Sequence, residues 1–183
     1  MLGRLLCAAA LLCAFPSGLL AAAGEPLLRL EVEVSRRLMT VVVDGRTAAQ
    51  FEVAVGKPRN PTPRGEYTID RVIWNPWWAP PDSPWAQGRS ARPPGHPANP
   101  MQAVKIPFRP LYYIHGTDRP DSIGKAASHG CIRMRVDDVV ELAKIMLWYT
   151  GDDREPDWYH HVLDERKQSE TPLALPVALV IRE

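Results

Sequence analysis

Apolar and polar residues in the first half of the chain follow the patterns of β-strands. Alternation and one β-branched run predict three strands, at residues 28–34, 38–43 and 49–55. The Asp44-Gly45 pair between the second and third strands predicts a tight hairpin, because glycine adopts a positive φ at little cost. A fourth strand is expected from Glu66 to Val72, after a proline-glycine turn. The first half therefore predicts an antiparallel meander.

The second half predicts one helix among short strands. Apolar residues at helical spacing follow Asp137 and Asp138 up to about Tyr149, and Gly151 suits the C-terminal stop. Asp137 and Asp138 are interpreted as structural, because acidic residues complement the dipole at a helix start. Short strands are expected at residues 111–114, 131–134 and 176–182.

Between residues 74 and 110 the periodicity gives way to prolines, glycines and aromatic residues. The tryptophans of this segment are Trp74, Trp77, Trp78 and Trp85. A loop of this length in a compact domain is usually functional, so one interpretation is a lid over a substrate site. The alternatives are that the tryptophans plug one end of a sheet core, or that they stack on sugars.

The N-terminal residues 1–23 have the layout of a secretory signal peptide. Arg4 precedes an apolar stretch at residues 5–15, and small residues ending at Ala23 follow. The apolar stretch is shorter than the roughly 20 residues of a comfortable membrane span. We therefore expect an exported protein, periplasmic or in the cell envelope, with a single domain at residues 24–183 and no membrane span after cleavage.

The charge of the chain is balanced, with 22 Lys and Arg residues against 21 Asp and Glu residues. Arg4 is the one charged residue of the expected leader, so its removal leaves 21 against 21. A balanced surface argues against nucleic acid as a partner, which would need a basic stripe.

Cysteine usage gives the first indication of chemistry. Cys7 and Cys13 lie in the expected leader, so Cys131 is the one thiol of the mature chain. A lone cysteine in an oxidising compartment cannot form an internal disulfide, and its neighbours here are glycine, histidine and arginine. We interpret Cys131 as a reactive thiol, not a packed hydrophobic residue. Such a thiol needs a partner to become a good nucleophile, and His115 is the candidate base.

Metal binding is the competing interpretation of these residues. His115, His129 and Cys131, with His160 or His161, would have to surround a zinc ion. Their spacing fits no common zinc pattern, so neither a metal nor a cofactor is expected. His160 and His161 are interpreted as exposed polar residues near a helix end or in a loop.

Two motifs carry a resemblance to a known family. Residues 114–117 (Ile-His-Gly-Thr) followed by residues 128–134 (Ser-His-Gly-Cys-Ile-Arg-Met) resemble the signature of the YkuD-type L,D-transpeptidases. Residues 55–67 resemble the family's glycine turn and strand start, and residues 74–100 resemble the proline-rich insertion of its ErfK/YbiS group. The resemblance implies a mainly β fold, a β-sandwich with one packed α-helix and a long loop rich in proline and tryptophan.

The resemblance also implies a reaction. Cys131 would attack the amide between the third residue of a peptidoglycan stem tetrapeptide and the terminal D-alanine, leaving a thioester that an amine resolves. His115 is the implied base, held by the carbonyl of Gly116. Backbone N–H groups near Gly130 and Cys131 would form an oxyanion pocket. The family is typically a target of carbapenems.

The remaining motif residues have open roles. Ser128 is expected to form local hydrogen bonds. His129 and Cys131 are two residues apart, so on a strand both side chains would face the same way, and His129 is either a second base or a residue that shapes the pocket. Arg133 either binds substrate carboxylates through a bidentate fork or pairs with a buried acid.

Several functions remain open at this stage. The acceptor is a second stem peptide, a lipoprotein lysine, a free D-amino acid or water, and with water the protein would be an L,D-carboxypeptidase. A peptidoglycan-binding module without turnover is the alternative from another class. The residues around Cys131 do not distinguish among acceptors, because acceptor choice depends on how open the thioester is to solvent.

Overall fold

The computed structural model describes residues 27–183, and the expected leader at residues 1–23 lies outside this range. The strands of the described part are β1 (Leu28–Glu33), β2 (Leu38–Val43), β3 (Arg46–Glu52), β4 (Val55–Gly56), β5 (Gly65–Trp74), β6 (Val104–Arg109), β7 (Tyr112–Gly116), β8 (Ala126–Ser128), β9 (Ile132–Met134) and β10 (Ser169–Arg182). Its α-helices are α1 (Val136–Thr150) and α2 (Pro156–Asp164). The expected mainly β fold with a packed helix is confirmed.

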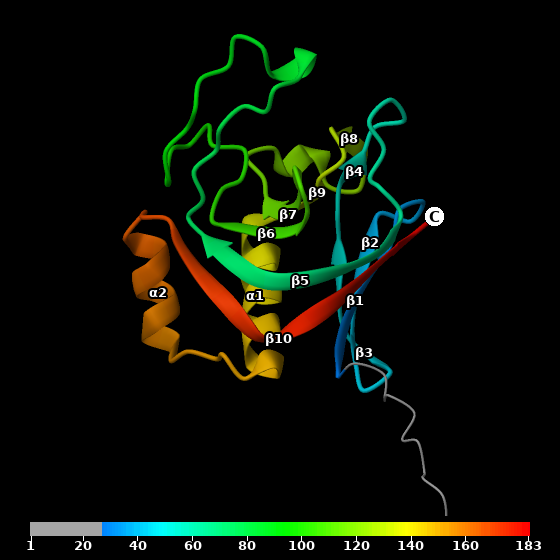
Figure 1. The fold of residues 1–183 in the computed structure, drawn as a ribbon, viewed down its shortest axis with the longest axis vertical. Coiled ribbons are helices and arrows are strands. Elements are labelled where there is room, and N and C mark those ends of the chain that lie inside the picture. The colour runs from blue at the N-terminus through cyan, green and yellow to red at the C-terminus, as the bar shows by residue number, and fades with distance from the viewer. Residues whose placement is uncertain (1–26) are drawn as a thin grey trace, which may run out of the picture.

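Hydrogen bonds join the longer strands into one eight-stranded sheet in the order β3-β2-β1-β10-β5-β6-β7-β9, and β4 pairs with β8 separately. The expected antiparallel meander holds for β1, β2 and β3. The prediction that β5 continues it is wrong, because β10 lies between β1 and β5, parallel to the first and antiparallel to the second. Both halves of the sheet share one hydrophobic core (Figure 1).

The hairpin between β2 and β3 has the backbone conformation that the sequence predicts. Asp44 has a φ of 48° and Gly45 a φ of 71°. Two successive positive φ values give a turn whose twist matches that of the flanking strands. This turn fixes the register of the β2–β3 pair at its closed end, where Val43 pairs with Arg46.

Helix α1 packs against one face of the sheet, where it contacts β10, β7 and β6. Its buried residues are Val139, Leu142, Ala143, Met146, Leu147 and Thr150. Asp137 and Asp138 occupy the first turn as expected, and Gly151 ends the helix with a φ of 82°. In Figure 1 the helix lies behind the strands, with the long loop at the opposite end of the molecule from the β1–β3 hairpins.

Two elements differ from the sequence-based expectation near the C-terminus. Helix α2 was not predicted, because it buries only Tyr159 and Val162 and so has a narrow apolar stripe. Pro156 at its first turn was the available signal. Strand β10 is longer than the expected 176–182, and its register shifts between Pro172 and Val177. The sequence does not predict the first part of this strand, since its prolines interrupt the strand pattern.

The segment expected as one loop from residue 74 to 110 contains β6 at its end, so the loop runs from residue 75 to 103. Pro107 lies inside β6 and obscured it in the sequence. Asn99 fastens the loop from within: its side-chain amide donates to the Pro76 carbonyl at 2.8 Å, and its Oδ1 accepts from the Met101 N–H at 2.9 Å. Across residues 27–183, neither helix has the length and apolar character needed to cross a bilayer.

Candidate active site

Strands β7 and β9 bring His115 and Cys131 to one place. The two strands pair in parallel, with His115 opposite Arg133. Paired residues point to the same face, and Cys131 precedes Arg133 by two positions. The neighbouring Gly116 packs toward Val139 of α1, so His115 points to the sheet face away from the helix. The imidazole therefore lies on the face that α1 leaves open, and Cys131 lies in the bend directly before β9, next to the residue that pairs with Ile114.

His115 is held in a defined orientation. Its Nδ1 lies 2.5 Å from the carbonyl oxygen of Gly116, the contact that the family resemblance implies. A carbonyl accepts a hydrogen bond only, so Nδ1 carries the proton and Nε2 is left as the basic nitrogen. Only 4% of His115 is exposed. Burial lowers the pKa of the imidazole from 6.5 to about 4, against the opposing effect of the Gly116 carbonyl, and the positive charge of Arg133 lowers it further.

Cys131 lies at the surface end of this pair and is partly exposed. Its Sγ is 3.7 Å from the carbonyl oxygen of Leu111. Burial raises the pKa of the thiol, while the Tyr113 backbone N–H and the charge of Arg133 act in the opposite direction. Because burial disfavours charge on both partners, the resting pair is a thiol and a neutral imidazole.

Ser128 and Gly130 shape the turn that carries Cys131. The Ser128 hydroxyl donates to the Cys131 carbonyl at 2.5 Å and accepts from the Gly130 N–H at 3.0 Å. Gly130 has a φ of 109°, and a Cβ there would lie 2.6 Å from Cε1 of Tyr112. No larger residue fits this position without moving the tyrosine ring, so the expected close approach of the main chain is present.

Strand alternation does not determine the direction of the His129 side chain. Residues 129–131 form a bend between β8 and β9, so the premise that His129 and Cys131 share a strand face is wrong. The positive φ of Gly130 interrupts the strand between them. The His129 ring stacks on Trp85, with centroids 4.2 Å apart and planes 6° from parallel. Burial lowers the pKa of His129, as do the nearby cations Lys57, Arg133 and Arg89.

Some of the tryptophans between residues 74 and 85 fill the core, and one lies beside the candidate site. Trp74, at the end of β5, is fully buried and its Nε1 donates to Thr171 at 3.1 Å. Trp78 is buried as well, whereas Trp77 is exposed. Trp85 instead reaches His129. The loop thus both closes the core and covers one side of the candidate site.

The Arg133 side chain lies near other charged side chains but is not paired with a carboxylate of the described residues. It forms no ion pair with any carboxylate of residues 27–183. Burial lowers the pKa of its guanidinium, and Asp118 is the strongest opposing influence. The alternative in which Arg133 pairs with a buried acid is therefore not what the structure shows.

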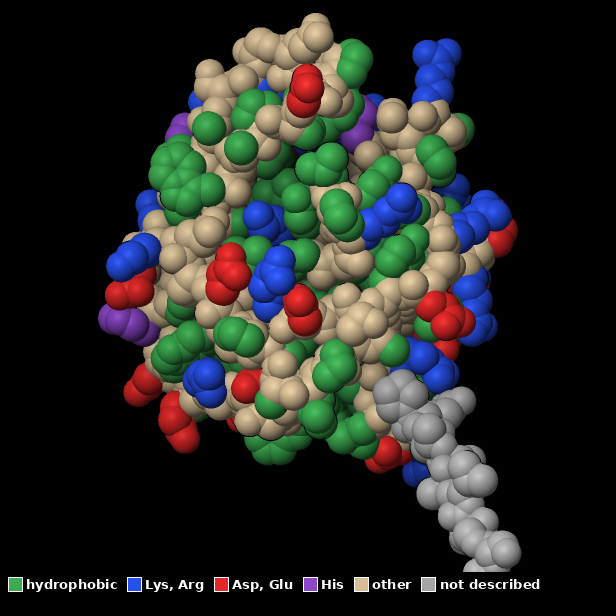
Figure 2. Space-filling model, viewed as in Figure 1, with side chains coloured by type: hydrophobic (Ala, Val, Ile, Leu, Met, Phe, Trp, Pro, Cys, Tyr) green, Lys and Arg blue, Asp and Glu red, His purple; other side chains and the backbone are tan. Residues whose placement is uncertain are grey.

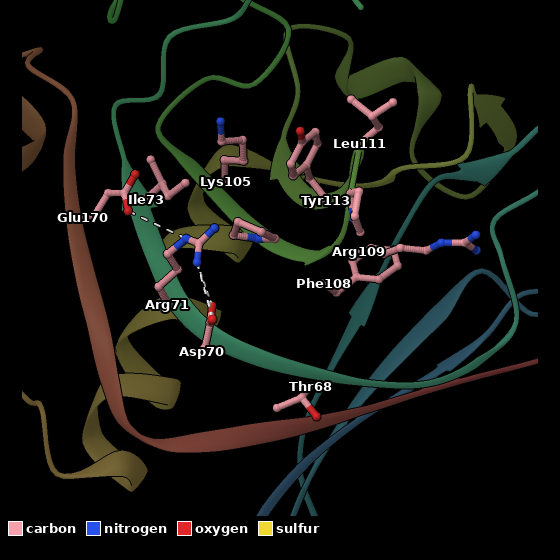
Figure 3. A pocket seen from close by; sticks show the side chains of 12 residues that line it. Thr68, Asp70, Arg71, Ile73, Lys105, Phe108, Arg109, Leu111, Tyr113 and Glu170 are labelled. Carbon is pink, nitrogen blue, oxygen red and sulfur yellow. Dashed lines mark hydrogen bonds and ion pairs between the residues drawn. The ribbon is translucent and has the colours of Figure 1, made fainter.

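An open groove crosses the sheet beside Leu111, the residue whose carbonyl oxygen lies near the thiol. It has a volume of about 490 Å³ and is lined by residues that include Leu111, Tyr113, Lys105, Arg71 and Glu170 (Figure 3). Figure 2 shows acidic and basic side chains beside one another on this face of the molecule, with apolar side chains around them.

Sequence reasoning missed several of these residues. Tyr113 carried a usable signal, because it lies two positions before His115 and so shares its face on a strand. Lys105 and Glu170 join the site only through strand pairing, and Trp85 only through the path of the loop. Nothing local in the sequence reveals such neighbours.

The described residues do not gather into a metal site. Within residues 27–183, no group of three or more His, Cys, Asp or Glu side chains is arranged to hold a metal ion. His160 and His161 lie on α2, where His161 is 3.2 Å from Glu165.

Relatives of known sequence are about one third identical to this chain over the segments that align. The Bacillus subtilis protein YqjB, named as an L,D-transpeptidase, is 33% identical over 125 residues, which cover 65% of this chain and 65% of that protein. YkuD of Bacillus licheniformis is 35% identical over 119 residues, 64% of this chain and 59% of the relative. ErfK/SrfK of Escherichia coli is 34% identical over 110 residues, 56% of this chain and 36% of the relative. The chain thus matches less than two thirds of each relative.

Solved structures share the fold. L,D-transpeptidase 3 from Mycobacterium tuberculosis superposes with a TM-score of 0.54 at 16% identity, covering 86% of this chain and 62% of that one. A second structure of that protein holds a faropenem-derived adduct and gives a TM-score of 0.53. Residues 28–165 match the family model for the L,D-transpeptidase catalytic domain. With three quarters of its length inside that match and the same fold around its His-Gly and Ser-His-Gly-Cys motifs, the chain belongs to the YkuD family of L,D-transpeptidases.

Proposed function

We propose that the protein is an exported L,D-transpeptidase that uses Cys131 as nucleophile and His115 as general base on peptidoglycan stem tetrapeptides. One observation carries the proposal. His115 lies on β7, Cys131 lies directly before the parallel partner strand β9, and the Gly116 carbonyl engages Nδ1 of His115, which leaves Nε2 to act as the base. Membership of the family supplies the substrate class.

The first half-reaction transfers the stem peptide to sulfur. His115 takes the thiol proton as Sγ of Cys131 attacks the carbonyl carbon between the third stem residue and D-alanine. The C–N bond breaks, His115 returns the proton to the departing amine, and D-alanine leaves. The acyl group stays behind as a thioester.

The second half-reaction reverses these steps with a new amine. The acceptor nitrogen attacks the thioester carbon, its proton passes through His115 to the sulfur, and the C–S bond breaks. The products are a new amide and the free Cys131 thiol. Because burial holds both partners neutral at rest, proton transfer accompanies each attack and no standing ion pair is needed.

The surrounding residues have supporting roles in this proposal. Gly130 already donates its N–H to Ser128, so the Cys131 N–H is the oxyanion donor at this turn. Arg133, without an ion-pair partner, binds a carboxylate of the donor stem. His129, stacked on Trp85, shapes the pocket.

The proposal includes location and domain organisation. Residues 1–23 form a leader that is removed on export, and residues 24–183 act as one catalytic domain in the periplasm or cell envelope. A single remaining thiol suits an oxidising compartment, because no internal disulfide can consume it.

Muropeptide analysis tests the reaction. Purified protein is incubated with tetrapeptide-bearing fragments, and the products are identified by mass spectrometry. Dimers joined between third residues are expected for cross-linking, or D-amino acid exchange if a free D-amino acid is the acceptor. Tripeptides alone would identify a carboxypeptidase, and unchanged tetrapeptides would identify a binding module and refute the proposal.

Two pairs of variants test the assigned residues. Cys131→Ala should abolish turnover and covalent capture by a carbapenem, seen as loss of the added mass on the intact protein. A persistent adduct in that variant would contradict the assignment of the nucleophile. His115→Gln should lose turnover, whereas His161→Gln, which alters an exposed imidazole on α2, should keep it.

A further inference from the structure

The groove described above reaches Leu111, a residue next to the sulfur of Cys131. Leu111, whose carbonyl lies 3.7 Å from Sγ, lines its near end, and Tyr113 follows. Arg71 and Glu170 line the far end. A molecule that reacts at the sulfur can therefore extend along the groove over the strands.

Strand pairing places Lys105 in this groove beside the catalytic pair. Each residue pairs with the next, and paired residues share a face, so one row crosses five strands on the open side of the sheet. The row consists of Arg133, His115, Lys105, Ile73 and Glu170. Arg133 and Lys105 thus stand on opposite sides of His115.

Lys105 is a cation held in place without a counterion. Its Nζ lies 5.1 Å from the centroid of the Tyr113 ring, and in Figure 3 the two side chains rise in the same direction from β6 and β7. Lys105 takes part in no ion pair with any carboxylate of residues 27–183. Burial lowers the pKa of its ammonium group, and the charge of Glu170 opposes this effect.

Arg71, the other cation in the middle of the groove, is already engaged. Its Nη1 is 3.2 Å from Oδ1 of Asp70, and its Nε is 3.7 Å from Oε2 of Glu170. A carboxylate entering the groove would compete with both acids for Arg71, whereas Lys105 feels the charge of Glu170 but forms no ion pair with a carboxylate of residues 27–183. Of the two cations, Lys105 is therefore the one available to a ligand.

The chemistry of the transfer indicates which carboxylate arrives there. The departing D-alanine and the incoming amine occupy the same side of the acyl carbon, because the second half-reaction is the reverse of the first. D-Alanine carries a carboxylate on the carbon that bears its nitrogen. A site that accommodates this leaving group therefore also suits an acceptor of the same kind.

Resting on the function proposed above, we propose that Lys105 determines acceptor specificity by binding the α-carboxylate of the departing D-alanine and of the incoming amine. The acceptors are then amines with a carboxylate on the same carbon, which are amino acids or the amino-acid end of a diamino acid side chain. A primary amine without that carboxylate is a poor acceptor. Arg133, across His115, serves the donor stem.

Two matched acceptors test this assignment. The rate of exchange into a tetrapeptide donor is measured with D-alanine and with D-alaninamide, which keeps the amine and removes the charge. A hydrogen bond to a charged partner predicts a preference for D-alanine of roughly tenfold to a hundredfold in kcat/KM. The amide's amine is less basic and so more of it is neutral, a bias that works against the expected result.

Variants of Lys105 and of a control lysine then test which residue causes the preference for D-alanine over D-alaninamide. Lys105→Met should reduce the ratio between the two acceptors to about one and should also slow D-alanine release from the donor, because the same contact is lost to the departing D-alanine. Lys105→Arg should restore part of the preference. Lys144→Met is the matched control, since its Nζ lies 5.2 Å from the centroid of the Tyr159 ring on a remote helix, and it should keep the full ratio.

Three results would overturn the assignment. Equal rates for both acceptors in the unaltered protein would show that no carboxylate is recognised. A preference that survives Lys105→Met would assign it to another residue. A fall in D-alanine release in that variant with an unchanged acceptor ratio would place Lys105 in the donor site. If the unaltered protein releases no D-alanine at all, the proposed function fails, and the acceptor site with it.

Discussion

Mild acid should destabilise the folded protein through His115. The imidazole is buried at 4% exposure, and its pKa falls from 6.5 to about 4 on folding, chiefly because burial disfavours its charged form. The unfolded chain therefore binds a proton at a pH where the folded protein does not. Stability from this group is fully present above the unfolded pKa, and it is lost as the pH falls from 6.5 toward about 4.

The size of the effect follows from the two pKa values. Each pKa unit corresponds to about 1.4 kcal/mol, so the full difference is worth about 3 kcal/mol in the free energy of unfolding. Between about pH 7.5 and about pH 4.5 the imidazole alone should remove about 2.5 kcal/mol of that free energy. Such a loss is a large fraction of the stability of an ordinary domain.

Urea unfolding at both pH values measures this contribution. Carboxyl groups also titrate in the range, so the quantity to compare is the pH-dependent loss in the wild type minus the loss in His115→Gln. The variant should lose about 2.5 kcal/mol less than the wild type. NMR titration of the histidine ring signals supplies a second measurement, in which His115 stays neutral down to about pH 4. Equal losses in the two proteins, or a ring that titrates near 6.5, would refute the reasoning.

Three other variants test local features. Gly130→Ala should lower stability by about 1–3 kcal/mol in urea unfolding and slow carbapenem capture, because its Cβ would meet Tyr112 at 2.6 Å and the backbone has a φ of 109°; an unchanged protein would contradict the tight turn. Trp85→Ala should raise the pKa of His129 toward its ordinary value in an NMR titration, since burial is the main cause of its lowering; no shift would mean that the stack does not persist in solution. Gly45→Ala should cost roughly 1–2 kcal/mol in urea unfolding with activity intact, because open space surrounds it and only its positive φ resists a side chain.

The sequence predicted those elements whose signals are local. The Asp44-Gly45 turn and helix α1 need only their own residues, and both lie where the pattern puts them. The position of β10 between β1 and β5 depends on contacts between residues far apart in the chain, which no periodicity encodes. The short, mostly polar α2 and the proline-containing β6 were missed because their own residues obscure the pattern.

The residues of the candidate site likewise divide into those with a local sequence signal and those that depend on contacts far apart in the chain. Cys131 and His115 were predicted because each stands in a contiguous motif, and the structure places His115 on β7 and Cys131 directly before the neighbouring strand β9. The role expected for His129 rested on strand geometry that Gly130 interrupts. Lys105 reaches the site through the β6–β7 pairing, so its relevance could not be seen before the register was known.

The placement of β10 has a consequence for how the chain folds. This strand follows all the others in sequence, yet it joins the two halves of the sheet. Within that sheet, β1–β3 and β5–β9 are linked only through β10, although β4 pairs with β8 and Ala54 bridges to Arg133 outside it. Because β10 pairs with strands far from it in the chain, completing the sheet at this seam is expected to be a late and slow step of folding.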